Sequence, residues 1–335
     1  MSTRTRTRGL SRTPGGALAL LSPQVMVVAS RALQSLATPV VALLVSTAAT
    51  LGGEIEHAIS FCNVLFVGNL CASGVVLASF GPHRLFSDLR AMGTGLWLES
   101  LAFGALAALL SSLIFAALET TSVTNVVLLA RLGPVCYVVA GALLLGFAVH
   151  RSEWLGFGVI AVGVLATVLA GSGFLITRGD LLVLASGAVY AAVTVMGKRL
   201  LPHTGLGALM FVRNFLSALV FFVIATVWLG PEHFAAAFYG PLWGIMVVYA
   251  LVVIVSAQLL WYRSIAKLTP ASVARWTVLT PALALAFAFF VNGERPSRMQ
   301  LTALAFITAG IAISSLGKRT PKGQSDSAEQ SVAAS

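Results

Sequence analysis

The chain has 335 residues, of which 58% are hydrophobic and only 10% charged, with a formal net charge of +10 and a mean hydropathy of +0.94. About 25% of the residues of a soluble globular protein are charged, so this composition excludes a soluble domain and indicates a protein embedded in lipid. The three cysteines give no disulfide framework and no Cys-x-x-Cys motif, and we predict neither a metal site nor a cofactor.

Ten apolar runs follow one another along the chain. A transmembrane helix needs about 20 mostly apolar residues to cross ~30 Å of hydrocarbon. The predicted spans are residues 33–51, 60–80, 95–117, 122–146, 154–175, 180–198, 206–229, 241–265, 270–292 and 299–317. The first span is limited by Arg31 and contains Pro39. The sequence therefore predicts an all-α integral membrane protein with ten transmembrane helices.

The segment before the first span is rich in Arg, Ser, Thr and Gly and has no apolar periodicity. We expect residues 1–30 to form a disordered basic cytoplasmic tail, and residues 319–335 to form a second disordered tail. No acidic residue precedes Glu54, which leaves an organellar transit peptide open. The loops between the spans are too short to hold a soluble domain, so the function must lie among the helices.

Lys and Arg are unevenly divided between the two sets of loops. With the N-terminus in the cytoplasm, the inner segments hold 15 of the 21 Lys and Arg, and the outer segments hold only Arg178, Arg295 and Arg298. The positive-inside rule then places both termini in the cytoplasm. The net positive charge reflects this topology, and we expect no nucleic-acid partner. The acidic residues of the loops and span ends, Asp180 and Glu294 among them, are interpreted as solvated.

An internal repeat relates the two halves of the chain. When Pro134 is placed on Pro281, residues 115–163 align without gaps with residues 262–310, at an offset of 147. Each half holds five predicted spans, an odd number, so equivalent helices run in opposite directions through the membrane. Inverted repeats of this kind are typical of transporters that work by alternating access.

A second match lies upstream, where FVGN at residues 66–69 resembles FVRN at residues 211–214, at an offset of 145. Pro134 and Pro281 interrupt predicted helices at corresponding places in the two halves. Helix breaks at matching positions point to a central binding site. A kink that serves only packing is the alternative.

Short motifs recur in a fixed order in both halves. They are Ser264-Ile265-Ala266, Thr269-Pro270-Ala271, Leu279-Thr280-Pro281, Gly293-Glu294-Arg295 and Gly310 in the second half, and Ala117-Leu118, Thr121-Ser122-Val123, Leu132-Gly133-Pro134 and Glu153-Trp154-Leu155-Gly156 in the first. Across all ten predicted spans, the chain resembles the EamA-like family of the drug/metabolite transporter superfamily. The resemblance implies two five-helix repeats, at residues 31–175 and 176–318, with a substrate cavity between them.

The chain departs from the family pattern at one place. Family members usually carry a Gly-Glu pair after the fourth span as well as after the ninth. Here Gly146 is followed by Phe147, whereas Gly293 and Glu294 keep the pair. This difference counts against a symmetric pair of functional carboxylates.

Three arginines lie within predicted spans, where a buried charge is costly and usually faces a cavity or a partner. Arg131 lies near the middle of the fourth span, Arg275 on the pseudo-equivalent face of the ninth, and Arg213 in the seventh. Because guanidinium groups bind carboxylate or phosphate bidentately, we predict a cavity for an anionic or amphipathic substrate. The alternative is that Arg213 and Arg275 extend toward the membrane surface.

Other residues of the spans are candidates for the same cavity, namely Asn125, Asn214, Tyr190 and Trp276. Each of these polar side chains also suits a hydrogen bond between helices. Glu99 and Glu119 are the carboxylates near enough to the spans to couple transport to protons, or to pair with Arg131. Proton antiport, substrate exchange and facilitated diffusion are all left open.

The sequence predicts a secondary transporter, a permease or exporter, that moves a small metabolite by alternating access. Its partners are the substrate and the lipid bilayer, and a homo-oligomer is left open. No HExxH, GxSxG or Walker motif is present, so we predict no enzyme and no ATP-driven pump. A structural or sensory membrane protein is the alternative. We expect a multi-pass protein of the plasma (inner) membrane if the source is bacterial, or of a plastid envelope if it is a plant or alga.

Overall fold

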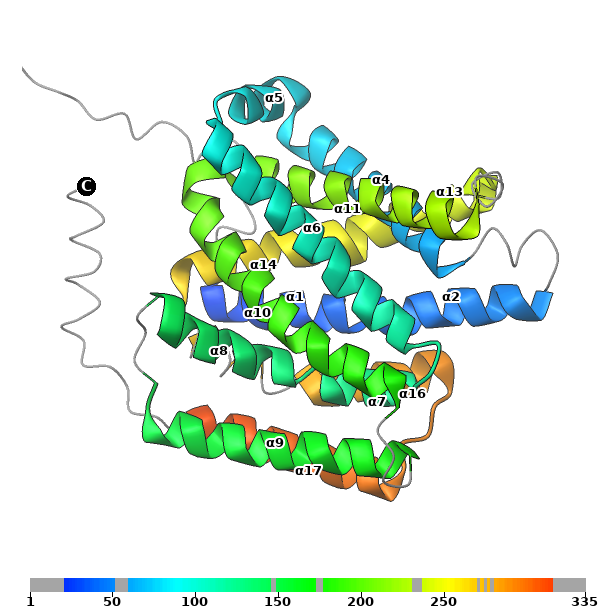
Figure 1. Ribbon diagram of the computed structural model, residues 1–335, viewed down its shortest axis with the longest axis vertical. Helices are drawn as coiled ribbons and strands as arrows, with labels where there is room; N and C mark the ends of the chain where they lie inside the picture. The colour runs from blue at the N-terminus through cyan, green and yellow to red at the C-terminus, as the bar shows by residue number, and fades with distance from the viewer. Residues whose placement is uncertain are drawn as a thin grey trace, which may run out of the picture.

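The structure, a computed structural model, describes residues 21–51, 60–145, 149–172, 177–230, 237–269, 272–273, 276–277 and 280–315, and within these ranges the ordered elements are all helical. The helices are α1 (Pro23–Ser35), α2 (Ala37–Leu51), α4 (Phe61–Phe80), α5 (Pro82–Arg90), α6 (Thr94–Ala117), α7 (Val123–Leu129), α8 (Leu132–Leu145), α9 (Arg151–Ser172), α10 (Arg178–Thr204), α11 (Leu206–Leu229), α13 (Gly240–Tyr249), the π-helix η2 (Ala250–Val255), α14 (Ser256–Lys267), α16 (Thr280–Asn292) and α17 (Arg298–Ser315). Most of them run between the same two ends of the bundle (Figure 1).

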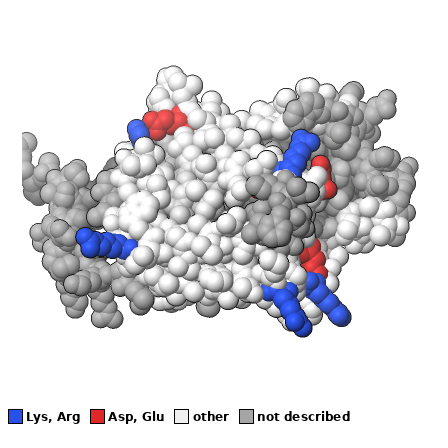
Figure 2. Space-filling model, turned by 60° about the horizontal axis from the view of Figure 1, so that its bottom comes forward, with Lys and Arg blue, Asp and Glu red and all other residues white. Residues whose placement is uncertain are grey.

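Within the described ranges, seven helical stretches are long and apolar enough to cross a membrane. They are Pro23–Thr50, Phe61–Phe80, Thr94–Ala117, Val123–Leu144, Arg178–Thr204, Leu206–Val227 and Gly240–Lys267, and two shorter apolar helices cover Ala282–Asn292 and Arg298–Ser314. Figure 2 shows a broad uncharged surface, with the charged residues gathered toward the two ends of the bundle. The protein is therefore an all-α, multi-pass integral membrane protein.

Each predicted span overlaps a helix of the structure, but the first helix begins earlier than expected. Ser22 caps α1 by accepting a hydrogen bond from the amide of Val25, and Pro23 occupies its first turn. Ser followed by Pro is a common helix start. Residues 23–30, expected in the tail, are thus helical, and Arg31 lies inside the first helical stretch instead of limiting it.

Helices α9 and α17 pack closely through glycine. An added Cβ on Gly156, Gly163 or Gly310 would lie within 3 Å of the opposite helix. Gly156 lies against Ser314, and Gly163, seven residues later, lies against Ala303, so the two helices are antiparallel. Small residues allow this close approach of two backbones.

The contacts of this helix pair are related by the internal repeat. An added Cβ on Gly163 would meet Cγ1 of Ile307, and one on Gly310 would meet Cγ1 of Ile160, both at 2.7 Å. Gly163 and Ile160 precede Gly310 and Ile307, respectively, by the same offset of 147 residues. The two copies of the repeat therefore meet here through equivalent residues.

The other contacts between the halves come in matching sets. Helices α4 and α11 pack together and are antiparallel, because Phe66 stacks near Phe222 while Phe80 lies against Gly207. Under the repeat, the contact of α1 with α14 is equivalent to the contact of α10 with α6. The contact of α11 with α6 is likewise equivalent to the contact of α4 with α13. Likewise, α10 packs on α8 as α1 and α2 pack on α16.

Candidate functional site

A cavity of about 220 Å³ lies between helices of the two halves. Arginines 31, 131 and 213 line it, and no carboxylate is among its described lining residues; we call it the arginine cavity. The other polar side chains of its wall are Gln34, Ser35, Thr38, Ser111, Ser186, Tyr190, Thr277 and Thr280. Charge effects are strong in a site of low dielectric constant, so this cavity favours an anion.

The interruption between α7 and α8 brings Arg131 into the arginine cavity. Helix α7 ends at Leu129, α8 begins at Leu132, and Pro134 occupies the first turn of α8. A proline has no N–H to donate to the preceding turn, which favours such a break. The Nε of Arg131 donates to the carbonyl of Val127 at 3.1 Å, which fixes the base of the guanidinium group.

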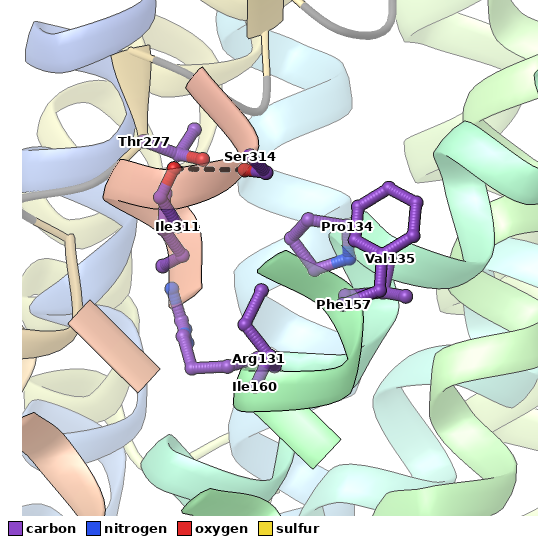
Figure 3. A pocket seen from close by; sticks show the side chains of 8 residues that line it. All are labelled: Arg131, Pro134, Val135, Phe157, Ile160, Thr277, Ile311 and Ser314. Carbon is purple, nitrogen blue, oxygen red and sulfur yellow. Dashed lines mark hydrogen bonds between the residues drawn. The ribbon is translucent and has the colours of Figure 1, made fainter. Parts of the chain in front are cut away.

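Arg131 also lines a smaller pocket of about 20 Å³. Figure 3 shows Pro134 across this pocket from Ile311, with the side chain of Arg131 extending toward Ile311 and with Thr277 and Ser314 above it. Since Thr277 lines both spaces, the guanidinium lies where α7 and α8 of the first half meet the second half.

Arg31 stands on α1 and is held mainly by aromatic rings. Its guanidinium carbon lies 3.5 Å from the ring centre of Trp261 and 5.8 Å from that of Tyr190. Its Nη1 donates to Oε1 of Gln34, and its Nε is buried without a partner in the described part of the chain. Stacking on indole is the most favourable cation–π arrangement, and it holds this positive charge at the wall of the arginine cavity.

Arg213 approaches the arginine cavity from α11. Its Nη1 donates to the hydroxyl of Tyr262 at 3.0 Å. The described residues contain one ion pair, which joins Arg199 to Glu99 at 3.5 Å. It lies on the surface, where the two side chains are 68% and 44% exposed. No carboxylate of the described chain thus neutralises the three arginines of the cavity.

The structure brings together four of the residues proposed from the sequence. Arg131, Pro134, Arg213 and Tyr190 all line the arginine cavity. Arg275 lies outside the described residues, and Pro281 lies in the first turn of α16 with its side chain outside them. Sequence reasoning missed Arg31, because a charge near the end of an apolar run was taken as its boundary.

The remaining candidates lie elsewhere. Asn214 is fully buried and exchanges hydrogen bonds of 3.0 and 2.8 Å with Gln258, which is the alternative role considered for it. Trp276 is 44% exposed and is absent from the walls of the described cavities. Glu99 pairs with Arg199 and not with Arg131, and Glu119 is exposed in the turn after α6.

Glu294 was expected to be solvated, and this interpretation is wrong. Its carboxylate accepts hydrogen bonds from the amides of Val123 and Thr124, at 3.0 and 2.9 Å, and from the hydroxyl of Thr124 at 2.6 Å. A carboxylate at the N-terminus of a helix satisfies its free amides and interacts favourably with the helix dipole. Glu294 of the second half therefore caps α7 of the first.

Glu294 is partly buried, whereas Asp180 is fully buried, contrary to expectation. It forms a capping box with Thr177 at the start of α10 and accepts a hydrogen bond from the hydroxyl of Thr121 at 3.2 Å. Asn125 donates to the same hydroxyl at 3.3 Å and accepts from Gln300 at 2.7 Å. Asn125 thus belongs to this hydrogen-bonded chain at the start of α7 and not to the wall of the arginine cavity.

The fold and the site define a multi-pass membrane protein with a polar, cationic cavity between two similar halves. Comparison with known proteins shows its family: the model of the EamA-like transporter family matches residues 34–169 and again residues 177–316. The chain belongs to this family, within the drug/metabolite transporter superfamily, which confirms the resemblance drawn from the motifs. It is a family of transporters and not of enzymes, so a small-molecule substrate follows.

Individual similarities agree with this assignment. The chain is 31% identical over 289 residues to an uncharacterized transporter of Synechocystis sp., covering 84% of this chain and 83% of that protein. A solved crystal structure has a similar fold, with a TM-score of 0.63 at 17% identity, covering 90% of this chain and 98% of the other.

Proposed function

We propose that this protein is a secondary transporter that moves a small anionic metabolite by alternating access through the arginine cavity. The observation that carries the proposal is the convergence of Arg31, Arg131 and Arg213 on one cavity with no acidic residue in its described wall. A structural or sensory protein would gain nothing from three such charges in lipid, where each one is costly.

The architecture that goes with this proposal is ten spans in two inverted repeats. Two observations support the inversion: α9 is antiparallel to its repeat equivalent α17, and α4 is antiparallel to its equivalent α11. The matching sets of contacts between the halves support it further. One packing arrangement applied twice can close either side of a central site in turn.

The cap formed by Glu294 suits a role at one gate of such a cycle. It joins the second half to the start of α7, and the following break carries Arg131 into the cavity. Separation of the halves at that end would exchange these hydrogen bonds for water, which costs little net free energy per bond. The carboxylates Glu99 and Glu119 are not in the cavity wall, which favours exchange or facilitated transport over coupling through them.

The test is transport by purified protein in liposomes. Loaded vesicles are offered a panel of labelled small carboxylates and phosphates, and counterflow is measured for wild type, Arg131→Leu and Arg213→Leu. The exposed Arg199→Leu, at 68% side-chain exposure, is the matched control. We expect anion counterflow with wild type and Arg199→Leu, and at least about tenfold less with the cavity variants. Equal counterflow by all four proteins, or transport of cations alone, would contradict the proposal.

A further inference from the structure

A second cavity of about 120 Å³, here called the side cavity, adjoins the arginine cavity. The two share five wall residues, Gln34, Ala37, Ser111, Phe115 and Arg213, so only side chains separate them. The side cavity has room for several water molecules or for a short chain of atoms. A cavity of this size beside the arginine cavity can hold part of a molecule that is bound there.

The side cavity arises where the two repeats differ. Asn214 and Gln258 exchange two hydrogen bonds between α11 and α14. The repeat offsets of 145 and 147 relate these residues to Asn69 and Ser111. Serine is too short to reproduce the amide pair, and the amide nitrogen of Asn69 donates instead to the carbonyl of Leu65 in its own helix, at 2.8 Å. The space that an amide pair fills in the second half is therefore left open in the first.

The wall of the side cavity offers hydrogen bonds but little charge. The side-chain oxygen of Asn69 and the hydroxyl of Tyr249 have no hydrogen-bond partner among the described residues. The π-helix η2 places Val253 and Ile254 in the same wall. Arg213, at the junction with the arginine cavity, is the one charged residue of this described wall. Such a wall suits an uncharged chain that ends in a hydroxyl or amide group.

We propose that the side cavity is a specificity subsite that takes the uncharged arm of an elongated substrate. The arginine cavity holds the carboxylate or phosphate head of that substrate, with Arg213 at the junction, and Asn69 and Tyr249 bind the polar end of the arm. The substrate class is thus an anion that bears a short flexible arm with a terminal hydroxyl or amide. This inference rests on the proposed anion transport and deepens it.

The test uses ω-hydroxycarboxylates of increasing length: glycolate, 4-hydroxybutanoate and 6-hydroxyhexanoate. Their binding to the purified full chain is measured by competition and by thermal stabilisation. Wild type should bind the longest at least about tenfold more tightly than glycolate, since the arm adds apolar contact and a hydrogen bond. Ser111→Gln, which restores the amide of the other repeat, should abolish this preference, so that this variant binds the three acids with affinities within about twofold of one another.

Three further variants separate filling of the side cavity from misfolding. Ser111→Ala removes the hydroxyl without filling the side cavity and should keep the preference for length. Gly68→Ala adds a methyl group at another residue of the wall, 3.5 Å from Sδ of Met246, and should reduce the preference. Gly74→Ala, on the same helix, has nothing within 4 Å of the added carbon and should match wild type.

The outcomes separate this inference from the proposed function. If wild type binds all three acids equally, or if Ser111→Gln and Gly68→Ala both keep the preference for length, the subsite is refuted while anion binding stands. If wild type binds none of these acids and no inorganic phosphate, the proposed function fails and the subsite fails with it.

Discussion

At the scale of single residues, the main lesson concerns arginine in a membrane helix. The positions of Arg131 and Arg213 deep within apolar runs were enough to predict a cationic cavity from the sequence. Arg31 could not be assigned in this way, because its partner Trp261 is 230 residues away and only the packing of α1 on α14 brings them together. A charge near the end of an apolar run can belong to the site and not to the loop.

Replacement of Arg31 distinguishes a ligand-binding role from a structural one. Its Nε is buried, its guanidinium shares a cavity with two other arginines, and it has no carboxylate partner among the described residues, so Arg31→Leu should unfold at the same temperature as wild type or a higher one. Anion binding should fall at least about tenfold, and Arg31→Lys should recover it only in part, because lysine lacks the planar, bidentate group. Thermal unfolding and anion titration test this; a destabilised Arg31→Leu that still binds anions like wild type would contradict it.

At the scale of elements, apolar runs and proline positions predicted where the helices lie but not how their ends are held. Glu294 follows a helix in sequence, like any loop acid, and its hydrogen bonds to the start of α7 join residues 171 and 170 positions apart. The Gly293-Glu294 motif was the available signal, since Gly293 adopts φ +70° and turns the chain after α16. The hydrogen-bonded chain from Asp180 to Gln300 had no comparable local signal.

The cap predicts the effect of a single change of charge. Glu294→Gln removes the negative charge and one of the two accepting oxygens at the start of α7, so it should destabilise the protein by about 1 kcal/mol. It should also speed hydrogen exchange of the amides of Val123 and Thr124, because Glu294 accepts hydrogen bonds from both. Glu119→Gln, exposed in the turn before α7, is the control. Equal stability and equal exchange in the two variants would show that the cap does not hold the start of α7.

At the interface between α9 and α17, the stability of the protein should depend strongly on the absence of a side chain at Gly310. Gly310→Ala places a methyl group within 3 Å of the backbone of Gly156, so the helices must separate, at a cost of about 1–3 kcal/mol. Gly158→Ala on α9 is the control: an added Cβ there has nothing within 4 Å, so this variant should be as stable as wild type. Thermal unfolding in one detergent compares them, and equal melting temperatures would mean that the contact is looser than described.

At the scale of the whole molecule, composition predicted a protein embedded in lipid, and the long apolar helices confirm it. The repeat predicted two similar halves, which the two matches of the family model support, while ten spans in inverted repeats stay a prediction. The start of α1 and the end of α17 lie at the same end of the bundle (Figure 1), as an even number of crossings requires. The side cavity could not be predicted, because it arises from small departures from the repeat, such as serine in place of glutamine at residue 111. The repeat is therefore the basis of the proposed transport mechanism, and its departures are the basis of the proposed specificity.

The distribution of Lys and Arg predicts that both termini lie in the cytoplasm. Labelling of introduced cysteines in intact cells tests this orientation. Arg84 on α5 and Arg295 in the turn between α16 and α17 are both exposed. Figure 1 shows α5 and the turn from α16 to α17 toward opposite ends of the bundle. In a protein whose Cys62, Cys71 and Cys136 are replaced by alanine, Arg295→Cys should react with a membrane-impermeant maleimide in intact cells. Arg84→Cys should react only after permeabilisation, because the segments rich in Lys and Arg stay in the cytoplasm. Labelling of Arg84→Cys alone in intact cells would reverse the orientation, and equal labelling of both would break the ten-span arrangement itself.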